Sequence, residues 1–169
     1  MKHLIVGGAR SGKSGYAEGQ AKALSASPVY LATGQGRDGE MQSRIAHHQA
    51  QRGSEWQLIE EPITLADALI PLQSQCVVID CLTLWLSNCL EHGCWEDERS
   101  RFLTALEQHE SDIFMVGNEL GSGIVPLGEL TREFVDENGR LHQDIAARCS
   151  HVSTVIAGLP LSLKGNHKL

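Results

Sequence analysis

Short apolar runs alternate with longer, helix-like stretches along the whole chain. The apolar runs cover residues 4–6, 28–32, 56–59, 76–80, 113–117 and 152–157. Most are short and continuous, which is typical of strands that are buried on both faces of a parallel sheet. The stretches between them predict helices at residues 13–24, 38–51, 64–69, 82–90, 96–110, 127–135 and 141–149.

This alternation predicts an α/β fold with a mostly parallel sheet and helices on both faces. No linker, repeat or low-complexity segment interrupts residues 1–169, so we expect a single domain. Ligands of such sheets bind beyond the carboxyl ends of the strands. Four residues fall at or just past a predicted strand end, namely Gly7, Thr33, Asp80 and Asn118. They are therefore expected to share one rim of the sheet.

The composition narrows the kinds of partner that the chain can have. Its 169 residues are 41% hydrophobic and 21% charged, which is too apolar for a disordered chain. No apolar run approaches the ~20 residues that a membrane-spanning helix needs. The formal net charge is −7 and there is no block of Lys and Arg, which argues against binding to nucleic acid. A phosphate-bearing ligand would have to be held by a local site.

The five cysteines point away from extracellular and zinc-binding proteins. They are Cys76, Cys81, Cys89, Cys94 and Cys149, and no two of them form a C-x-x-C pair. An odd number with irregular spacing argues against a disulfide framework and a structural zinc site. We interpret them as unpaired thiols of a protein that works in a reducing cytoplasm.

The segment from Gly7 to Ser14 matches the phosphate-binding motif G-x-x-x-x-G-K-[ST] without a mismatch. A strand is predicted before it and a helix after it, and this context argues against a chance match in a glycine-rich turn. Glycines let the backbone wrap so that its N–H groups point at phosphate oxygens, and the helix adds the positive end of its dipole. Lys13 would bring a charge to the outer phosphates, and the Ser14 hydroxyl would be a ligand of Mg²⁺. We therefore expect a P-loop NTPase-like fold of the RecA-like type.

Asp80 ends the apolar run of residues 76–80 and is the best candidate for the carboxylate that accompanies such a loop. It would hold Mg²⁺ or the water molecules around it. The alternative is that Asp80 caps the helix that follows. With the P-loop alone, these features indicate an NTPase or a kinase and name no acceptor.

Two adjacent histidines lie on the predicted helix of residues 38–51. Met41, Ile45 and His48 are spaced so that they share one face of this helix, whereas His47 is turned about 100° away from it. A histidine that points inward near bound phosphates could act as a nucleophile. The alternative is a packed or hydrogen-bonded residue, which is the more common role of a single helical histidine.

Two further features follow predicted strands. Glu60 and Glu61 come after residues 56–59, where a carboxylate could accept hydrogen bonds from a ribose or a guanine edge, or could simply be solvated. Residues 118–126 contain two glycines and a proline after the run of residues 113–117. They form either a shaped loop on the ligand rim or an ordinary connection.

Six segments, taken in their order, resemble one family. They are GGARSGKS at residues 7–14, YLATGQ at 30–35, RIAHHQAQR at 44–52, VVIDCLTLWLSN at 77–88, NELGSGIVP at 118–126 and GRLHQDIA at 139–146. With this set the chain resembles the bifunctional adenosylcobinamide kinase / adenosylcobinamide-phosphate guanylyltransferase of cobalamin biosynthesis. The P-loop is shared by many proteins, whereas the ordered set is specific and spans almost the whole chain.

The resemblance implies an enzyme with two steps. It would first phosphorylate the aminopropanol hydroxyl of adenosylcobinamide with ATP or GTP. GTP would then guanylylate a histidine and release pyrophosphate, and the GMP would pass to the cobinamide phosphate to give adenosylcobinamide-GDP. In the family the second histidine of the pair takes the GMP, which corresponds to His48 here. The helical-face argument selects the same residue.

The resemblance also implies the residues of the site. Lys13 and His48 would be catalytic, and Ser14 and Asp80 would hold Mg²⁺. The implied nucleotide contacts are Gly7, Gly8, Ala9, Arg10, Ser11, Gly12, Lys13, Ser14, Ala32, Thr33, Gly34, Gln49, Ala50, Gln51, Arg52, Glu60 and Asp80. Asp80 stands where some members have Glu, and His142 stands where Asn is expected. The family further implies a homo-oligomer, a trimer, with sites near the subunit boundaries.

Two other functions fit part of this pattern. One is a different small-molecule P-loop kinase in which His48 is merely structural, and the other is a nucleotide-binding or switch protein without catalysis. GTP labelled at the α-phosphate distinguishes them, because only the bifunctional enzyme would form a covalent histidine adduct. The sequence leaves open whether ATP or GTP feeds the kinase step, which residues contact the corrinoid, and which group acts as a base.

Overall fold

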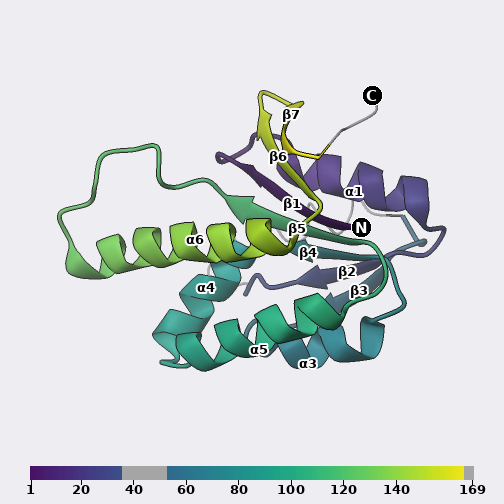
Figure 1. Cartoon of the computed structure of the whole chain (residues 1–169), viewed down its shortest axis with the longest axis horizontal. Helices are drawn as coiled ribbons and strands as arrows, with labels where there is room; N and C mark the ends of the chain where they lie inside the picture. Colours follow the sequence, from purple (N-terminus) through teal and green to yellow (C-terminus); the bar gives the residue numbers. More distant parts are fainter. Residues whose placement is uncertain (36–52, 166–169) are drawn as a thin grey trace.

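The computed structural model describes residues 1–35 and 53–165, which are built around one seven-stranded sheet (Figure 1). The strands lie in the order β3-β2-β4-β5-β1-β6-β7, and all neighbours are parallel except β6 and β7. Their bounds are β1 Lys2–Gly7, β2 Val29–Ala32, β3 Gln57–Glu60, β4 Val77–Asp80, β5 Ile113–Asn118, β6 His151–Ile156 and β7 Leu159–Lys164. The helices are α1 Lys13–Leu24, α3 Leu65–Leu69, α4 Leu82–Glu91, α5 Trp95–Gln108 and α6 Glu129–Arg148, with a 3₁₀ turn, η1, at Ile70–Leu72.

Helices cover the sheet on both of its faces, as the sequence predicts. The larger cluster of buried side chains lies between the sheet and α3, α4, α5 and α6, with Trp85, Phe102 and Leu106 at its centre. The smaller cluster lies on the other face, where Ala17 and Ala21 of α1 pack against the strands. Figure 1 shows α1 on its own side of the sheet and α4, α5 and α6 on the opposite side. The central strands β1, β4 and β5 are buried on both faces, which explains why they are continuous apolar runs.

The strands and helices predicted among the described residues are present, with outer ends that differ by at most two residues. The helix predicted at residues 38–51 lies outside the described residues. Two predictions about the last third of the chain are wrong, one about a helix and one about a strand.

The helices predicted at residues 127–135 and 141–149 are one continuous helix, α6. Asn138 and Gly139 lie between the two predicted ranges, and glycine disfavours a helix interior by about 1 kcal/mol. The packing of Leu141 and Ile145 into the larger cluster outweighs this cost. The Asn138 side chain is also used in tertiary hydrogen bonds, so it does not compete with the helix backbone.

The run of residues 152–157 was predicted as the final strand. It forms β6, and a further strand, β7, follows it in an antiparallel hairpin. The two strands are joined by Ala157 and Gly158, which both have positive φ, of 53° and 80°. This is the backbone conformation of a tight two-residue hairpin turn. The turn escaped prediction because an L-residue such as alanine rarely occupies its first position. Every residue of β7 is exposed.

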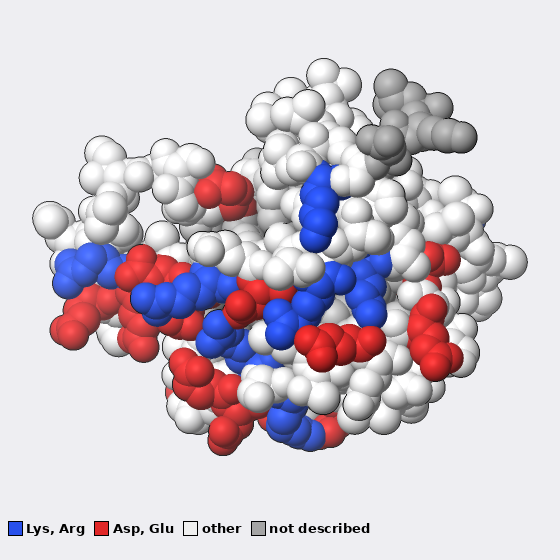
Figure 2. All heavy atoms as spheres, viewed as in Figure 1, with Lys and Arg blue, Asp and Glu red and all other residues white. Residues whose placement is uncertain are grey.

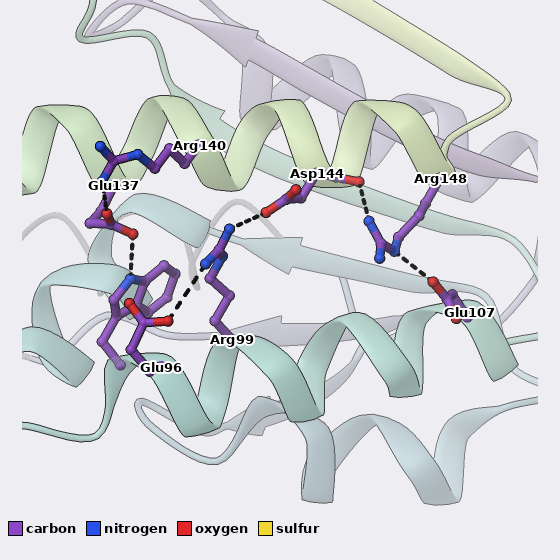
Figure 3. A network of polar contacts seen from close by, with 8 residues as sticks. Glu96, Arg99, Glu107, Glu137, Arg140, Asp144 and Arg148 are labelled. Carbon is purple, nitrogen blue, oxygen red and sulfur yellow. Dashed lines mark hydrogen bonds and ion pairs between the residues drawn. The ribbon is translucent and has the colours of Figure 1, made fainter.

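Hydrogen bonds and ion pairs join α5 to α6 along their length (Figure 3). Arg99 contacts Asp144, and Arg148 Nε lies 2.7 Å from Glu107 Oε1. The Trp95 indole N–H donates to the Glu137 carboxylate at 2.8 Å, and both residues are buried. Exposed pairs contribute little to stability, but a buried bond to a charged acceptor fixes the two helices more firmly. These contacts set the position of α6.

The longest of the described helices, α6, carries many charged residues, and no described helix has the length and apolar character to cross a bilayer.

Candidate functional site

The four residues predicted to share one rim do lie at the same edge of the sheet. Gly7, Asp80 and Asn118 are the last residues of β1, β4 and β5, and Thr33 directly follows β2. These four strands are parallel and adjacent in the order β2-β4-β5-β1, so their carboxyl ends meet at one edge. The segment of residues 8–12 begins at this edge and leads into α1.

The loop of residues 7–14 has the backbone of a phosphate-binding loop. Gly12 has φ of +94°, which favours glycine because it has no side chain to clash. Gly12 is also the N-cap of α1, so no side chain caps the first turn and no acidic residue lies in it. The N–H groups of that turn are thus available to an anion. Gly8, Ala9 and Arg10 are exposed around this turn.

The loop is anchored at its centre by the β6–β7 turn. The Gly158 N–H donates a hydrogen bond to the Ser11 carbonyl oxygen at 2.8 Å. The Ser11 hydroxyl is buried and has no hydrogen-bond partner among the described residues. Gly158 lies far away in sequence and was not predicted to take part, because nothing in its local sequence points to the loop.

Lys13 and Ser14 occupy the first turn of α1. Lys13 is only 8% exposed, and its ammonium donates to the Gly8 carbonyl oxygen at 3.0 Å, so the charge lies within the loop. Ser14 is half-buried beside it. Within the described part of the chain this carbonyl oxygen is the hydrogen-bond partner of the buried ammonium, and a phosphate oxygen would compensate its charge better.

Asp80 is held in place by a residue that was not predicted. The Tyr30 hydroxyl of β2 donates to Asp80 Oδ2 at 2.6 Å, and Tyr30 is itself buried. Burial, and after it the nearby Asp80 charge, raises the pKa of the neighbouring Cys81 thiol to about 12. Helix α1, which begins with Lys13, packs against β4 and β5. Asp80 has no role as a side-chain cap of α4, because no such hydrogen bond forms there.

The residues at this edge fit a Mg²⁺ ion. Protein sites for Mg²⁺ that act on nucleotides usually supply one or two oxygen ligands, and the phosphates and water complete the shell. Asp80 offers the carboxylate oxygen that Tyr30 does not engage, and Ser14 offers a hydroxyl. No group of three His, Cys, Asp or Glu side chains that could hold an ion by themselves occurs in residues 1–35 and 53–165. The donor set therefore suits an ion that arrives with a nucleotide.

Thr33 is fully buried and all of its polar groups are engaged within the protein. Its hydroxyl donates to the Cys81 carbonyl oxygen at 2.8 Å and accepts from the Cys81 N–H at 2.9 Å. The Thr33 carbonyl oxygen accepts from Asn88, and its N–H donates to the Asp80 carbonyl oxygen. Thr33 thus braces the backbone beside Asp80, while Ala32 and Gly34 on either side are half-buried.

The two adjacent glutamates after β3 have different roles. Glu61 Oε1 accepts hydrogen bonds from the backbone N–H groups of Ile63 and Thr64, both at 2.8 Å, so it supports the start of α3. Glu60 is the last residue of β3 and is exposed. Glu60 therefore lies on the surface at the carboxyl edge of the sheet.

Part of the predicted site lies outside the described residues. This applies to His48 and to the predicted contacts Gln49, Ala50, Gln51 and Arg52. The described part consists of residues 7–14, 32–34, Glu60 and Asp80.

The structure adds Tyr30, Thr83, Asn138 and Gly158 as residues that hold the backbone or side chains of the site. Thr83 and Asn138 both bond to the backbone of Asn118. Sequence reasoning missed them because they come from distant parts of the chain, and no short motif marks a residue that acts through a tertiary hydrogen bond.

His142, which stands where the family leads us to expect Asn, packs directly over β5. A Cβ at Gly117 would lie 2.3 Å from His142 Nε2, so only glycine leaves room for this ring. His142 Nε2 is buried and has no hydrogen-bond partner among the described residues. Burial lowers the pKa of His142 to about 4, and the Glu119 carboxylate acts in the opposite direction.

Acid is therefore expected to cost wild-type protein more stability than a His142→Asn variant. The ordinary pKa is 6.5, so below that pH the unfolded chain binds a proton that the folded chain does not. The neutral ring's full contribution to the free energy of unfolding is present above pH 6.5. It is lost as the pH falls toward 4, and the loss amounts to at most about 3 kcal/mol. Urea unfolding at several pH values in this window measures both proteins. If the free energy of unfolding fell equally with pH in wild type and variant, the lowered pKa of His142 would not be the cause.

Comparisons with known proteins extend over almost the whole chain. Residues 3–163 match the family described as cobinamide kinase / cobinamide phosphate guanyltransferase. The chain is 48% identical over 170 residues to the bifunctional adenosylcobalamin biosynthesis protein CobP of Pseudomonas aeruginosa, covering 98% of each chain. It is 34% identical over 186 residues to the bifunctional adenosylcobalamin biosynthesis protein CobU of Escherichia coli, covering 97% of this chain and all of that one.

Among solved structures, the fold is similar to that of an ATPase from the type III secretion system of pathogenic bacteria. The TM-score is 0.51 at 13% sequence identity, and the match covers 95% of this chain and 56% of the other. At this identity the likeness concerns the fold alone, which is that of a RecA-like P-loop protein.

Proposed function

Because the chain belongs to the cobinamide kinase / cobinamide phosphate guanylyltransferase family, we propose which of its residues perform the two reactions. The protein is a bifunctional enzyme of adenosylcobalamin biosynthesis with both activities. Its substrates are nucleotides and a cobinamide. What the family membership leaves open is how residues 7–14, Asp80 and His48 divide the chemistry between them.

The loop of residues 7–14 binds the triphosphate in both reactions. The observation that carries this proposal is the position of the Lys13 ammonium, buried inside a glycine-rich loop at the carboxyl edge of a parallel sheet. The uncapped N–H groups at the start of α1 surround the same space. Lys13 neutralises charge on the outer phosphates and stabilises the charge that develops on the leaving group.

Ser14 and Asp80 hold a Mg²⁺ ion that accompanies the nucleotide. When bound, such an ion neutralises negative charge on the phosphate oxygens. Tyr30 keeps the Asp80 carboxylate in a fixed orientation through its hydroxyl, 2.6 Å from Oδ2. Thr33 braces the peptide that follows Asp80, so the carboxylate has a rigid support.

In the kinase reaction the loop presents the γ-phosphate of ATP or GTP to the cobinamide hydroxyl. The hydroxyl oxygen bonds to the γ-phosphorus, the bond from that phosphorus to the β–γ bridging oxygen breaks, and the hydroxyl proton is released. The products are cobinamide phosphate and a nucleoside diphosphate. Lys13 acts on the oxygen of the leaving diphosphate, where negative charge accumulates.

In the guanylyltransferase reaction His48 is the nucleophile. A neutral imidazole nitrogen bonds to the α-phosphorus of GTP, and pyrophosphate leaves. An oxygen of the cobinamide phosphate then attacks the same phosphorus, the nitrogen–phosphorus bond breaks, and His48 is regenerated. This assignment rests on the family resemblance of residues 44–52 and on the helical face that His48 shares with Met41 and Ile45.

Labelling with GTP that carries ³²P at the α-phosphate tests the covalent half of this proposal. Wild-type protein with Mg²⁺ should retain label after denaturation, and the adduct should be lost in acid and stable in alkali, as expected for a phosphoramidate. GTP labelled at the γ-phosphate is the control and should leave no label. Absence of protein-bound label from α-labelled GTP would overturn the histidine intermediate.

The remaining nucleotide contacts come from the neighbouring strand ends. Residues 32–34 and Glu60 lie at or just past the ends of β2 and β3, and the Glu60 carboxylate can accept hydrogen bonds from a ribose or a guanine. Gln49, Ala50, Gln51 and Arg52 adjoin the nucleophile in the sequence and complete the nucleotide site.

Residues 1–169 act as one domain. All five cysteines are free thiols, which suits the reducing conditions of the cytoplasm.

The protein works as a homotrimer that forms through the exposed apolar strand β7. Ile156, Leu159 and Leu161 are 59–73% exposed, and their pairing across the β6–β7 hairpin puts them on one face. The region of β6 and β7 appears almost free of charged side chains in Figure 2. A long, exposed apolar edge strand is unusual in a monomer and typical of an interface.

A Leu161→Asp variant is therefore expected to dissociate the oligomer. Size-exclusion chromatography with light scattering should give three times the chain mass for wild type and the mass of one chain for the variant. Ser162→Asp, on the opposite face of the same strand, is the matched control and should remain oligomeric. A wild-type protein that elutes as a monomer would contradict the trimer.

A further inference from the structure

The end of β5 lies between the two parts of the phosphate site. Asn118, its last residue, pairs in register with Gly7 of β1, where the P-loop begins. On its other side β5 pairs with β4, and Asp80 at the end of β4 lies opposite Val116. A side chain at the end of β5 is therefore flanked by the P-loop and by the Asp80 carboxylate.

Strand alternation puts the Asn118 side chain on the α1 face of the sheet. Phe114 and Val116 precede it by four and two residues, and both pack in the smaller cluster together with Ala17 of α1. Residues two apart in a strand project from the same face, so Asn118 continues this row. The P-loop leads into α1 and therefore lies over this face.

Asp80 and Lys13 belong to the same face. Asp80 follows Val78 by two residues, and Val78 packs in the same smaller cluster. Tyr30, which donates to Asp80, is part of that cluster as well. Lys13 is the first residue of α1, which packs against β4 and β5, and Ala17 of the same helix lies in the smaller cluster. Asn118 thus shares both the edge and the face of the proposed phosphate-binding groups.

Two buried side chains hold the backbone of Asn118. Its N–H donates to Thr83 Oγ1 at 2.8 Å, and its carbonyl oxygen accepts from Asn138 Nδ2 at 3.0 Å. The Thr83 hydroxyl in turn donates to Asn138 Oδ1 at 3.2 Å, and both side chains are at most 4% exposed. Because β4 ends at the level of Val116, no strand pairs with these backbone groups, and the two side chains take the place of that partner.

This arrangement explains the fixed backbone of Asn118 but not its side chain. The backbone bonds would form with any residue at this position, since they use only N–H and C=O groups. The Asn118 carboxamide makes no hydrogen bond within the described residues, and it is half-buried at an edge where phosphates are proposed to bind. An amide on a fixed backbone that has no partner within residues 1–35 and 53–165 is suited to bind a ligand.

We propose that the Asn118 carboxamide donates a hydrogen bond from Nδ2 to a non-bridging oxygen of the γ-phosphoryl group in the kinase reaction. Thr83 and Asn138 are its positioning residues. This inference rests on the proposal that residues 7–14 hold the triphosphate. As the cobinamide hydroxyl oxygen bonds to the γ-phosphorus and the bond to the β–γ bridging oxygen breaks, the donor stabilises the oxygens of the transferred group. A preorganised neutral donor does so without reorganisation.

The contact acts differently in the two reactions. In the kinase reaction the γ-phosphorus is the reacting atom, so Asn118 contacts the group whose charge distribution changes. In the guanylyltransferase reaction the α-phosphorus reacts and the γ-phosphate leaves as part of pyrophosphate. There the same hydrogen bond is nearly equal in the ground state and the transition state, so it has little effect on the rate. Loss of the amide should therefore affect mainly phosphorylation.

The experiment compares Asn118→Ala, which removes the donor, with Asn118→Asp, which replaces it by a repelling carboxylate. For each, kcat is measured for cobinamide phosphorylation and separately for GMP transfer to supplied cobinamide phosphate, and Kd is measured for the nucleotide. We expect a loss of about 100-fold in the kinase kcat, a loss of less than about 10-fold in GMP transfer, and little change in Kd. Thr83→Val should shift the ratio of the two activities in the same direction by less.

Two outcomes would overturn the inference. One is a kinase kcat within about three-fold of wild type in both Asn118 variants, and the other is an equal loss in the two reactions. If Asn118→Asp does not fold, Asn118→Ala decides, because its backbone bonds to Thr83 and Asn138 are unchanged. A failure of the P-loop proposal is seen separately, since Lys13→Ala would then bind nucleotide as wild type does.

Discussion

A Lys13→Ala variant is expected to lose at least ~100-fold in kcat/KM for both the kinase and the guanylyltransferase reaction. Both reactions expel a phosphate-bearing leaving group, and the Lys13 ammonium is the buried cation of the loop that is proposed to hold it. Alanine leaves the N–H groups of the loop in place but removes the charge that stabilises the departing oxygen. Both activities should therefore fall together, and nucleotide binding should weaken.

Steady-state kinetics with cobinamide and with cobinamide phosphate measure the two losses, and titration with GTP measures binding. Lys22→Ala is the matched control, because Lys22 is another cation of α1 that is exposed and pairs with Glu55 at 2.6 Å. That control should keep both activities. Full turnover in Lys13→Ala would show that the loop of residues 7–14 is not the triphosphate site.

A His48→Ala variant is expected to lose the covalent GMP adduct and at least ~10³-fold of its guanylyltransferase activity, as removal of a nucleophile does elsewhere. Its cobinamide kinase activity should survive, because phosphorylation passes directly from the nucleotide to the hydroxyl. The readouts are protein-bound label from α-labelled GTP and the separate rates of the two reactions. This split distinguishes a nucleophile from a packed histidine, whose loss would lower both rates through stability.

His47→Ala is the control, since His47 adjoins His48 but is predicted to lie on another face of the helix. It should label as wild type does. If the label persisted in His48→Ala and vanished in His47→Ala, His47 would be the nucleophile instead of His48. An unlabelled wild type with an active kinase would instead favour a P-loop kinase in which His48 is structural.

Much of the fold follows from local patterns. Parallel strands such as β1, β4 and β5 are apolar on both faces, so each is visible as a continuous run that ends in a polar or small residue. The P-loop is equally local, because eight consecutive residues supply the glycines, the lysine and the serine. The predictions for the α6 helix and the β6–β7 hairpin were wrong because these elements do not follow local patterns. There, burial of Leu141 and Ile145 and the turn at Ala157 override local preference.

The support of the site was not visible in the sequence. Tyr30 reaches Asp80 across fifty positions, and Thr83 and Asn138 meet at Asn118 from α4 and α6. The Thr33 side chain likewise bonds to the backbone of Cys81 on the next strand's end and does not stand open at the edge. Such roles depend on strand order and register, which single residues do not encode.

By itself, the sequence determined the phosphate-binding loop, the α/β fold, the family and the identity of the proposed nucleophile, His48. The first two depend on contacts between near neighbours in the chain. The family is marked by six ordered segments, and His48 is singled out by family resemblance and the spacing along a predicted helix. Only the tertiary structure decided that β5 lies between the P-loop and Asp80. It also decided that the Asn118 backbone is held there by Thr83 and Asn138, while its amide bonds to none of the described residues. The reason is physical: the strand order β4-β5-β1 is set by how the whole sheet and its helices bury their apolar faces, and this order brings Asn118 to Gly7 across more than a hundred residues.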